Sequence, residues 1–321
     1  MMTAIDREML VPDDLAGKRI DSVSAILFDD FSRATLSGWI RDGSLKVNGK
    51  VVKPKMKLIG GERITLRTVR VAREDWSTAQ DINFGIIYED DDLIVINKPS
   101  GLVVHPGAGN RDGTLVNGLV SHRKTLAFLP RAGIVHRLDK NTTGLMLVAA
   151  TEAAFKKLTS DIQNREVQRH YEAIVEGAMI SGGEINRPIG RNPRNRLLKA
   201  VRPEGREART MVSILEKFVD HTVLDITLKT GRTHQIRVHM SSEGFPIVGD
   251  NAYGFKGRAP KGASAELTTA LRHFGRQALH AKRLVLKHPV TGEEKDFKIE
   301  PPPDYRHLVS LLRDDNVQDD A

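Results

Sequence analysis

A polar segment between two apolar runs constrains the fold of this chain most strongly. Ile134-Val135 precede the segment and Leu145 to Val148 follow it, and polar or charged side chains lie between the runs, among them His136, Arg137, Asp139, Lys140, Thr142 and Thr143. Short apolar runs bounded by turn residues are typical of buried strands. The pattern predicts two short buried strands joined by a polar turn, which would hold the Asp139 carboxylate at the edge of a sheet.

Asp139 has two interpretations from the residues alone. An Asp in a polar turn most often bonds its own backbone, and its side chain then has no further task. A carboxylate with cationic neighbours and little water is also the usual starting material of a nucleophile or a general base. Both interpretations stay open at this point.

The length and charge of the chain limit its organisation and its partners. A chain of 321 residues exceeds the usual size of a single core, so we expect two domains. The net charge of +8 indicates a polyanionic partner, of which nucleic acid is the commonest, although a basic surface can also serve solubility alone. The chain has no cysteine, which excludes disulfides, thiolate nucleophiles and cysteine-based zinc sites and fits a cytoplasmic protein.

The composition along the chain suggests four parts. We expect a small domain over residues 1–70, a linker over 71–82, a large domain over 83–313 and a flexible tail over 314–321. The first residues carry acids and no apolar core, so they do not resemble a signal peptide. No apolar run approaches the roughly 20 residues that cross a membrane, so we expect no membrane partner.

The first 70 residues predict a compact basic module. Apolar residues at helical spacing indicate one helix between Arg19 and Asp30, and Ser32 is a plausible N-cap for a second helix. Asn48-Gly49 between two short alternating segments predicts a β-hairpin. The basic side chains here form either a solvated face or a surface for RNA, and they include Arg33, Arg41 and Lys50.

A second cluster of basic side chains lies between residues 191 and 209. Only two acids, Glu204 and Glu207, accompany seven cations: Arg191, Arg194, Arg196, Lys199, Arg202, Arg206 and Arg209. Scattered Gly and Pro residues predict a protruding hairpin or loop. Such a run is often only a solvated face, but an arm this basic is well suited to contact phosphates.

Two familiar kinds of ligand site are absent from the sequence pattern. The glycine-rich segment 107–113 matches neither the phosphate-loop nor the dinucleotide-binding spacing, so we expect no nucleotide cofactor. His234 and His239 are five residues apart and lie poorly on one helical face, so we expect no metal pair.

Several blocks of the chain resemble one family. The segment from His136 to Gly144 resembles the HRLDxxTSG signature of the pseudouridine synthases that modify ribosomal and transfer RNA, with Thr143 where Ser is common. The blocks NKPSGLVVHPGAGNRDGT, GRTHQIRVH and PIVGDNAYG continue this resemblance in family order, and residues 32–52 resemble an alpha-L RNA-binding module. The extra N-terminal module makes the chain most similar to the group that acts on large-subunit ribosomal RNA.

The resemblance implies a fold and an activity. It implies an α+β catalytic domain with a mainly antiparallel mixed sheet, flanking helices and a central cleft, joined to a small N-terminal alpha-L type domain. The expected reaction is the isomerisation of specific uridines to pseudouridine in RNA, most simply 23S ribosomal RNA, by a monomer without cofactor or metal. The alternatives are a non-catalytic RNA-binding or ribosome-assembly factor and a glycosidase or nuclease, although a glycosidase normally needs two carboxylates.

The resemblance also assigns roles to residues. Asp139 corresponds to the catalytic Asp, which acts either as a nucleophile or as a base, and Arg237 to the Arg that pairs with it, with Arg232 as the second choice for that pairing or a phosphate contact. Tyr171 corresponds to a Tyr that lies against the target base, although an aromatic core residue is the simpler interpretation. Arg137 is expected to fill the gap left by a flipped base or to hold the adjacent phosphate. The other expected RNA contacts are His136, Arg232, Arg191, Arg194, Arg196, Arg33, Arg41 and Lys50.

Overall fold

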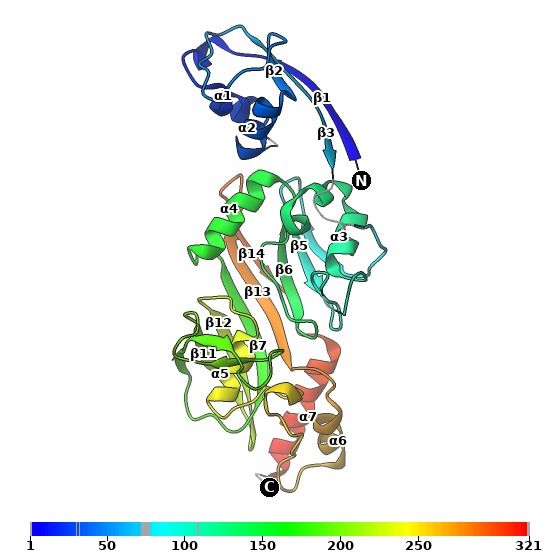
Figure 1. The fold of residues 1–321 in the computed structure, drawn as a ribbon. Coiled ribbons are helices and arrows are strands. Elements are labelled where there is room, and N and C mark those ends of the chain that lie inside the picture. Colours follow the sequence, from blue (N-terminus) through cyan, green and yellow to red (C-terminus); the bar gives the residue numbers. More distant parts are fainter. Residues whose placement is uncertain (1, 30, 32, 72–77, 108, 320–321) are drawn as a thin grey trace.

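The computed structural model describes residues 2–29, 31, 33–71, 78–107 and 109–319. Figure 1 shows a small N-terminal unit of three strands and two helices, followed by a larger unit built around one long sheet. Within these described ranges, no helix is both long enough and apolar enough to cross a bilayer.

The N-terminal unit has its own apolar core. Helices α1 (Ile20–Leu27) and α2 (Arg33–Asp42) pack on a sheet of order β1-β3-β2, in which β1 is Met2–Leu10, β2 is Leu45–Val47 and β3 is Arg63–Val71. One hydrophobic cluster of this unit contains only residues between Val11 and Leu66. The apolar stripe of each helix faces the sheet, as its helical spacing predicts.

Three details of this unit differ from the sequence prediction or lie outside the description. Strand β1 was not predicted, because Asp6, Arg7 and Glu8 give it little apolar alternation and its partner β3 is distant in sequence. The turn at Asn48-Gly49 is present, with positive φ at both residues, but only an isolated bridge between Val47 and Lys50 follows it, and β2 pairs with β3 instead. Ser32, the expected N-cap, and residues 72–77 of the expected linker lie outside the described residues.

The larger unit is organised by a nine-stranded sheet of order β4-β5-β6-β13-β7-β12-β11-β8, with β14 on the side of β13. Among the described strands of this sheet, every pairing is antiparallel except that of β6 with β13, which confirms the predicted α+β class. The strands are β4 (Gly85–Glu89), β5 (Leu93–Lys98), β6 (Thr143–Ala149), β7 (Gln168–Glu176), β8 (Gly183–Asn186), β11 (Arg209–Lys217), β12 (His221–Leu228), β13 (Leu279–Lys287) and β14 (Glu294–Lys298).

Strands β5 and β6 are buried on both faces, which explains their unbroken apolar sequences. Met146 and Val148 join the main cluster beneath helix α3 (Leu115–His122), whereas Leu145 and Leu147 join a second cluster beneath helix α4 (Glu152–Gln163). Alternate side chains of a strand point to opposite faces, so each face acquires its own core.

The remaining elements surround the sheet. They are the two-stranded ribbon β9 (Ile189–Arg191) and β10 (Lys199–Val201), helices α5 (Gln235–Ser242), α6 (Ala265–His273) and α7 (Pro303–Asp319), and the short 3-10 helices η1 (Asp13–Leu15), η2 (Lys124–Phe128), η3 (Pro130–Gly133) and η4 (Asn251–Tyr253). The ribbon matches the predicted basic hairpin. Helix α7 runs to Asp319, and the Asp315 carboxylate accepts a hydrogen bond from the backbone N–H of Ser264, so part of the expected flexible tail packs on the start of α6.

The polar segment that begins at His136 leads into β6, but its first flank is not a strand. Ile134 makes only an isolated antiparallel bridge with Val148, and the chain continues irregularly to Asp139 and a turn in which the Thr142 N–H donates to the Asp139 carbonyl. The predicted pair of strands is therefore wrong for its first member, because η3 ends immediately before it. Asp139 nevertheless lies at an end of the sheet, just before β6, as expected.

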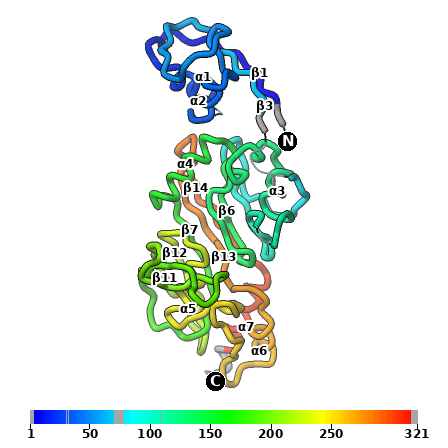
Figure 2. Tube along the Cα trace, in the orientation of Figure 1, coloured from blue at the N-terminus to red at the C-terminus, as the bar shows by residue number. Residues whose placement is uncertain are grey.

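Gly144 brings the two central strands together at this point. Its φ is +116°, and a Cβ there would lie 2.3 Å from the carbonyl oxygen of Ala281 on β13. Figure 2 shows β6 and β13 side by side although they are far apart in the sequence. Only glycine permits this close parallel contact, which places the segment that contains Asp139 against β13 and β7.

Candidate active site

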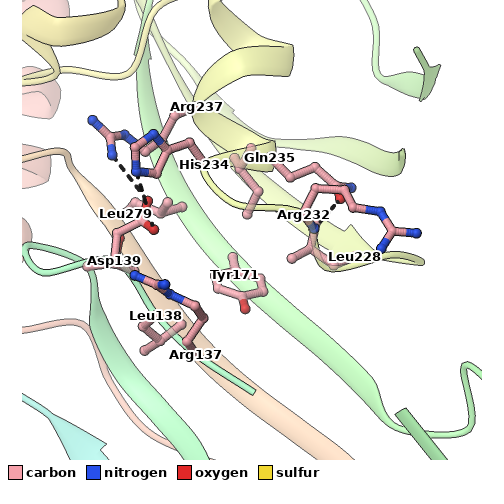
Figure 3. A pocket seen from close by; sticks show the side chains of 12 residues that line it. Arg137, Leu138, Asp139, Tyr171, Leu228, Arg232, His234, Gln235, Arg237 and Leu279 are labelled. Atoms are coloured by element: carbon pink, nitrogen blue, oxygen red, sulfur yellow. Dashed lines mark hydrogen bonds and ion pairs between the residues drawn. The ribbon is translucent and has the colours of Figure 1, made fainter. Parts of the chain in front are cut away.

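The Asp139 carboxylate lines two adjoining hollows on the surface of the large unit. The smaller, of about 50 Å³, is bounded by Asp139, Tyr171, Leu228, His234 and Arg237, among others. The larger, of about 540 Å³, shares Arg137, Asp139, Tyr171 and Arg232 with it. The expected cleft is therefore present, and Asp139 belongs to both hollows. Figure 3 shows the side chains that line the smaller hollow, Asp139 among them.

Asp139 and Arg237 form the ion pair that the sequence predicted. Nη1 of Arg237 donates to Oδ2 of Asp139 at 3.1 Å, from the first turns of α5. The same guanidinium also holds Asp250 with two hydrogen bonds, from Nε at 2.6 Å and from Nη2 at 2.9 Å. Burial lowers the pKa of Arg237, but the hydrogen bonds and charges of Asp250 and Asp139 outweigh this and raise the pKa above its usual value. Arg237 is therefore a permanent cation between two carboxylates.

His234 and Tyr253 complete the other side of the carboxylate. Nε2 of His234 lies 3.8 Å from Oδ1 of Asp139, and its Nδ1 lies 2.7 Å from the Tyr253 hydroxyl, which also accepts a hydrogen bond from the backbone N–H of Lys199. Burial lowers the pKa of His234, although the negative charge of Asp139 opposes this effect. A neutral His234 that receives the Tyr253 O–H at Nδ1 presents its Nε2–H to Asp139.

Asp250, His234 and Tyr253 were not predicted as site residues. His234 was considered only as a metal ligand, and Asp250 and Tyr253 belong to the block PIVGDNAYG, to which no role was given. The ring of Tyr253 lies under the Arg237 guanidinium, with Cζ 4.7 Å from the ring centroid. The signal that could have found Asp250 is the need of a buried arginine for more than one acceptor.

Tyr171 belongs both to the hydrophobic core and to the lining of the two hollows. It lies on the central strand β7, is only 5% exposed and belongs to the main hydrophobic cluster. It also lines both hollows beside Asp139, where Figure 3 shows it between Asp139 and Leu228. Burial raises the pKa of Tyr171, so its hydroxyl stays protonated at neutral pH.

The three other predicted residues near Asp139 differ in their surroundings. Arg137 is exposed at the rim of both hollows, and no described residue forms an ion pair or hydrogen bond with its guanidinium. Arg232 does not contact Asp139, because its Nε donates to the carbonyl of Glu207. Nε2 of His136 accepts the backbone N–H of Leu147, and burial lowers the pKa of His136 to about 3, so it is neutral and anchors the polar segment to β6.

The more distant predicted RNA contacts lie on two surfaces. Arg191, Arg194 and Arg196 are exposed on the β9–β10 ribbon. In the N-terminal unit Arg41 and Lys50 are exposed.

Arg33 is less free than expected, since its Nη2 forms an ion pair with Asp21 at 3.0 Å. The structure therefore gathers Asp139, Tyr171 and Arg237, the residues expected to be catalytic, around one cavity and spreads the basic residues over separate surfaces.

Lys98, which the sequence analysis did not single out, fixes the polar segment from below. In its protonated form, the fully buried Nζ of Lys98 donates to the carbonyl oxygens of Pro99, Leu102 and Lys140, the residue that follows Asp139. Burial lowers the pKa of Lys98 to about 7, although the negative charge of Asp139 acts in the opposite direction. Lys98 therefore ties the end of β5 to the turn that carries Asp139.

The comparisons with known proteins agree with this geometry. Residues 92–242 match the family model described as RNA pseudouridylate synthase. The chain is 52% identical to ribosomal large subunit pseudouridine synthase D of Vibrio parahaemolyticus over 96% of this chain and 95% of that protein. It is 49% identical to the protein of the same name from Pseudomonas aeruginosa, over 98% of both chains.

Solved structures are similar as well. Human RNA pseudouridylate synthase domain containing 4 is 28% identical with a TM-score of 0.56, over 71% of this chain and 93% of that one. Human RNA pseudouridylate synthase domain containing 1 is 25% identical with a TM-score of 0.55, over 73% of this chain and 89% of that one.

The chain belongs to the RNA pseudouridylate synthase family. It is accordingly an enzyme that isomerises uridine in RNA, rather than a non-catalytic RNA-binding factor.

The depressed pKa of Lys98 predicts a specific dependence of stability on pH. Between pH values of about 7 and 10.5 the unfolded chain holds a proton at this lysine that the folded chain has lost, so the free energy of unfolding rises with pH in this window. Lys98→Met lacks this contribution, and its unfolding free energy rises less steeply over the same window. Urea denaturation at a series of pH values measures both slopes, and identical slopes would contradict the assignment.

Proposed function

We propose that this enzyme converts specific uridines of large-subunit ribosomal RNA to pseudouridine, with Asp139 as its catalytic residue. The observation that carries the proposal is the Asp139 carboxylate at a cationic cavity, ion-paired with an arginine that Asp250 holds in place. The names of the relatives in Vibrio and Pseudomonas support ribosomal RNA as the substrate.

The reaction moves a bond without consuming a second reactant. The bond between the ribose C1′ and uracil N1 breaks, the base turns, and C1′ joins C5, whose proton leaves as N1 gains one. Asp139 serves this sequence either by attacking the sugar or the base or by removing a proton beside C1′, and both routes need an ionised carboxylate. Arg237 orients the carboxylate through the ion pair between its Nη1 and Oδ2 of Asp139.

The residues around Asp139 have separate tasks in this proposal. The uridine must leave its stack to enter the hollow, which costs a few kcal/mol. Tyr171 offers an aromatic face to the uracil, and Arg137 at the rim fills the gap in the stack or holds the neighbouring phosphate. Arg232 and the neutral His136, which both line the larger hollow, bound the path of the RNA.

Asp250 is the second carboxylate near Asp139, but it does not favour a glycosidase. It is 3% exposed, and both of its oxygens accept hydrogen bonds from Arg237. A glycosidase needs a second carboxyl group that faces the substrate as acid, base or nucleophile. The geometry therefore supports chemistry that depends on one carboxylate.

We further propose that the chain acts in the cytoplasm as a monomer of two domains. Residues 1–70 would grip RNA through Arg41 and Lys50, with Arg33 contributing beside its Asp21 contact, and residues 83–313 would carry the reaction. The separate hydrophobic cluster between Val11 and Leu66 supports this division. The exposed Arg191, Arg194 and Arg196 of the ribbon would contact phosphates near the cavity.

Replacing Asp139 by Asn is expected to abolish pseudouridine while folding and RNA binding remain. Carbodiimide-based mapping of ribosomal RNA measures the modification in a deletion strain that expresses the variant, and gel-shift titration measures binding. Asp296→Asn, at an exposed ion pair with Arg283, is the matched control and should restore modification. Undiminished modification by Asp139→Asn would sink the assignment.

Charge reversal on the ribbon is expected to weaken RNA binding and flatten its salt dependence. With Arg194 and Arg196 both changed to Glu, the slope of log K against log salt should fall by roughly one to two, since each lost phosphate contact accounts for about 0.7 to 0.9. Arg272→Glu with Arg306→Glu, on helices α6 and α7, makes the same change of net charge elsewhere. Equal slopes for the two double variants would count against the ribbon.

A further inference from the structure

A buried arginine in the larger hollow has no anionic partner among the residues that the structure describes. Arg169 lies on β7 and is 5% exposed, and its Nε is buried without a hydrogen-bond partner. Nowhere in the described residues does the guanidinium form an ion pair or a side-chain hydrogen bond. Its side chain nevertheless lines the cavity of about 540 Å³ beside Asp139.

An unpaired guanidinium in this position carries a free-energy cost. Burial of a charge is strongly unfavourable unless the charge is paired and its donors find acceptors, and a guanidinium has five N–H donors. The cost of burying Arg169 is therefore offset only when an anion enters the cavity from outside the chain.

The surroundings of Arg169 indicate which anion fits. Six further cations line the same cavity: Arg131, Arg137, Arg165, Arg206, Lys229 and Arg232. Among the described residues, Asp139 is the only carboxylate that lines this cavity, and Arg237 already holds Asp139. A guanidinium fork matches the oxygens of a phosphate, and a cavity of this charge selects a phosphodiester over a neutral group.

Glycine at position 231 leaves space for the Arg169 guanidinium, and it is not required there by a special backbone conformation. A Cβ at residue 231 would lie 2.7 Å from Nη1 of Arg169, whereas the φ of Gly231 is outside the left-handed region. A side chain at residue 231 would therefore push the guanidinium from its place. The first residue of the block GRTHQIRVH thus reserves space for Arg169.

We propose that Arg169 binds a backbone phosphate of the substrate RNA immediately beside the target uridine. Arg169 and Tyr171 are two residues apart on β7, so their side chains share one face about 7 Å apart, a separation that a single nucleotide spans. A uracil against Tyr171 then places a neighbouring phosphate at Arg169. This phosphate subsite rests on the proposed function, because it takes the same RNA as its ligand.

The first test separates binding from stability. Arg169→Met should weaken binding of a fluorescein-labelled large-subunit ribosomal RNA fragment by about tenfold or more and lower the salt slope by about one. The thermal midpoint of the free protein should stay the same or rise, because an unpaired buried charge is removed. A structural role would instead lower the midpoint and leave the salt slope unchanged, and that result would overturn the subsite.

Two further variants bracket this result. Gly231→Ala keeps the charge but displaces the guanidinium, so it should weaken binding in the same direction. Arg306→Met removes an exposed arginine of α7 and should change neither affinity nor slope. Full affinity for both Arg169→Met and Gly231→Ala would overturn the proposal.

A double-substitution test identifies the phosphate itself. Neutral methylphosphonates are placed one at a time on either side of the uridine that the wild-type protein isomerises. At one position the methylphosphonate should lower the affinity of the wild-type protein but should not lower the affinity of Arg169→Met any further. If the methylphosphonate lowers the affinity of both proteins equally at every position, the phosphate subsite is overturned but the proposed function is not. Failure of the wild-type protein to isomerise any uridine of this RNA would overturn the proposed function instead, and the salt slopes of bound RNA remain readable in that case.

Discussion

The Arg237 guanidinium, held between two carboxylates, is the interaction on which the site depends. Asp250 takes two of its hydrogen bonds and Asp139 takes one. Two buried charges, Arg237 and Asp250, beside the half-buried Asp139 are costly to assemble, and the geometry offsets this cost by satisfying both oxygens of Asp250. Asp139 shares the cation through Oδ2 alone, so its Oδ1 remains directed at the cavity beside His234. The ion pair with Arg237 thus orients the Asp139 carboxylate and leaves Oδ1 open to the cavity.

The fold brings this group together from segments that are distant in sequence. Asp139 precedes β6, Arg237 lies on the helix after β12, and Asp250 precedes η4. The close contact at Gly144 and the three carbonyl bonds of Lys98 fix the segment that carries Asp139 against the sheet. The Tyr253 hydroxyl connects His234 to the backbone of the basic ribbon at Lys199, so the surface proposed to contact RNA is joined to the site by two hydrogen bonds.

Much of this could be predicted from local patterns. Strands β5, β6 and β7, the N-cap of α4 at Thr151 and the basic ribbon follow from apolar runs, capping residues and charge, and the Asp139–Arg237 pair followed from the family resemblance. The errors concern contacts that no local pattern encodes. β1 exists because a distant strand pairs with it, Ile134 lies beside β6 without forming a strand, and α7 continues because Asp315 contacts the start of α6.

The same reasoning explains which site residues were missed. Asp250 could be identified only once the acceptors around Arg237 were known, and the backbone hydrogen bond that His136 accepts inside the protein was not predicted. Lys98 and Arg169 are ordinary cations in the sequence, and their importance comes from burial. Sequence therefore points to the group that we propose to react, whereas the residues that position it depend on the packed structure.

The most direct test of this account is the rate of Asp250→Asn, which keeps the shape of the side chain and removes the charge that holds Arg237. Release of tritium from RNA labelled at uridine C5 reports the reaction. We expect kcat to fall by about 100-fold, the typical effect of misplacing a reacting group by about 1 Å, while the Kd for RNA stays unchanged. Asp304→Asn, which breaks an equivalent two-bond pair with Arg276, should keep the wild-type rate. A wild-type rate for Asp250→Asn would contradict the central role of the Arg237 bridge.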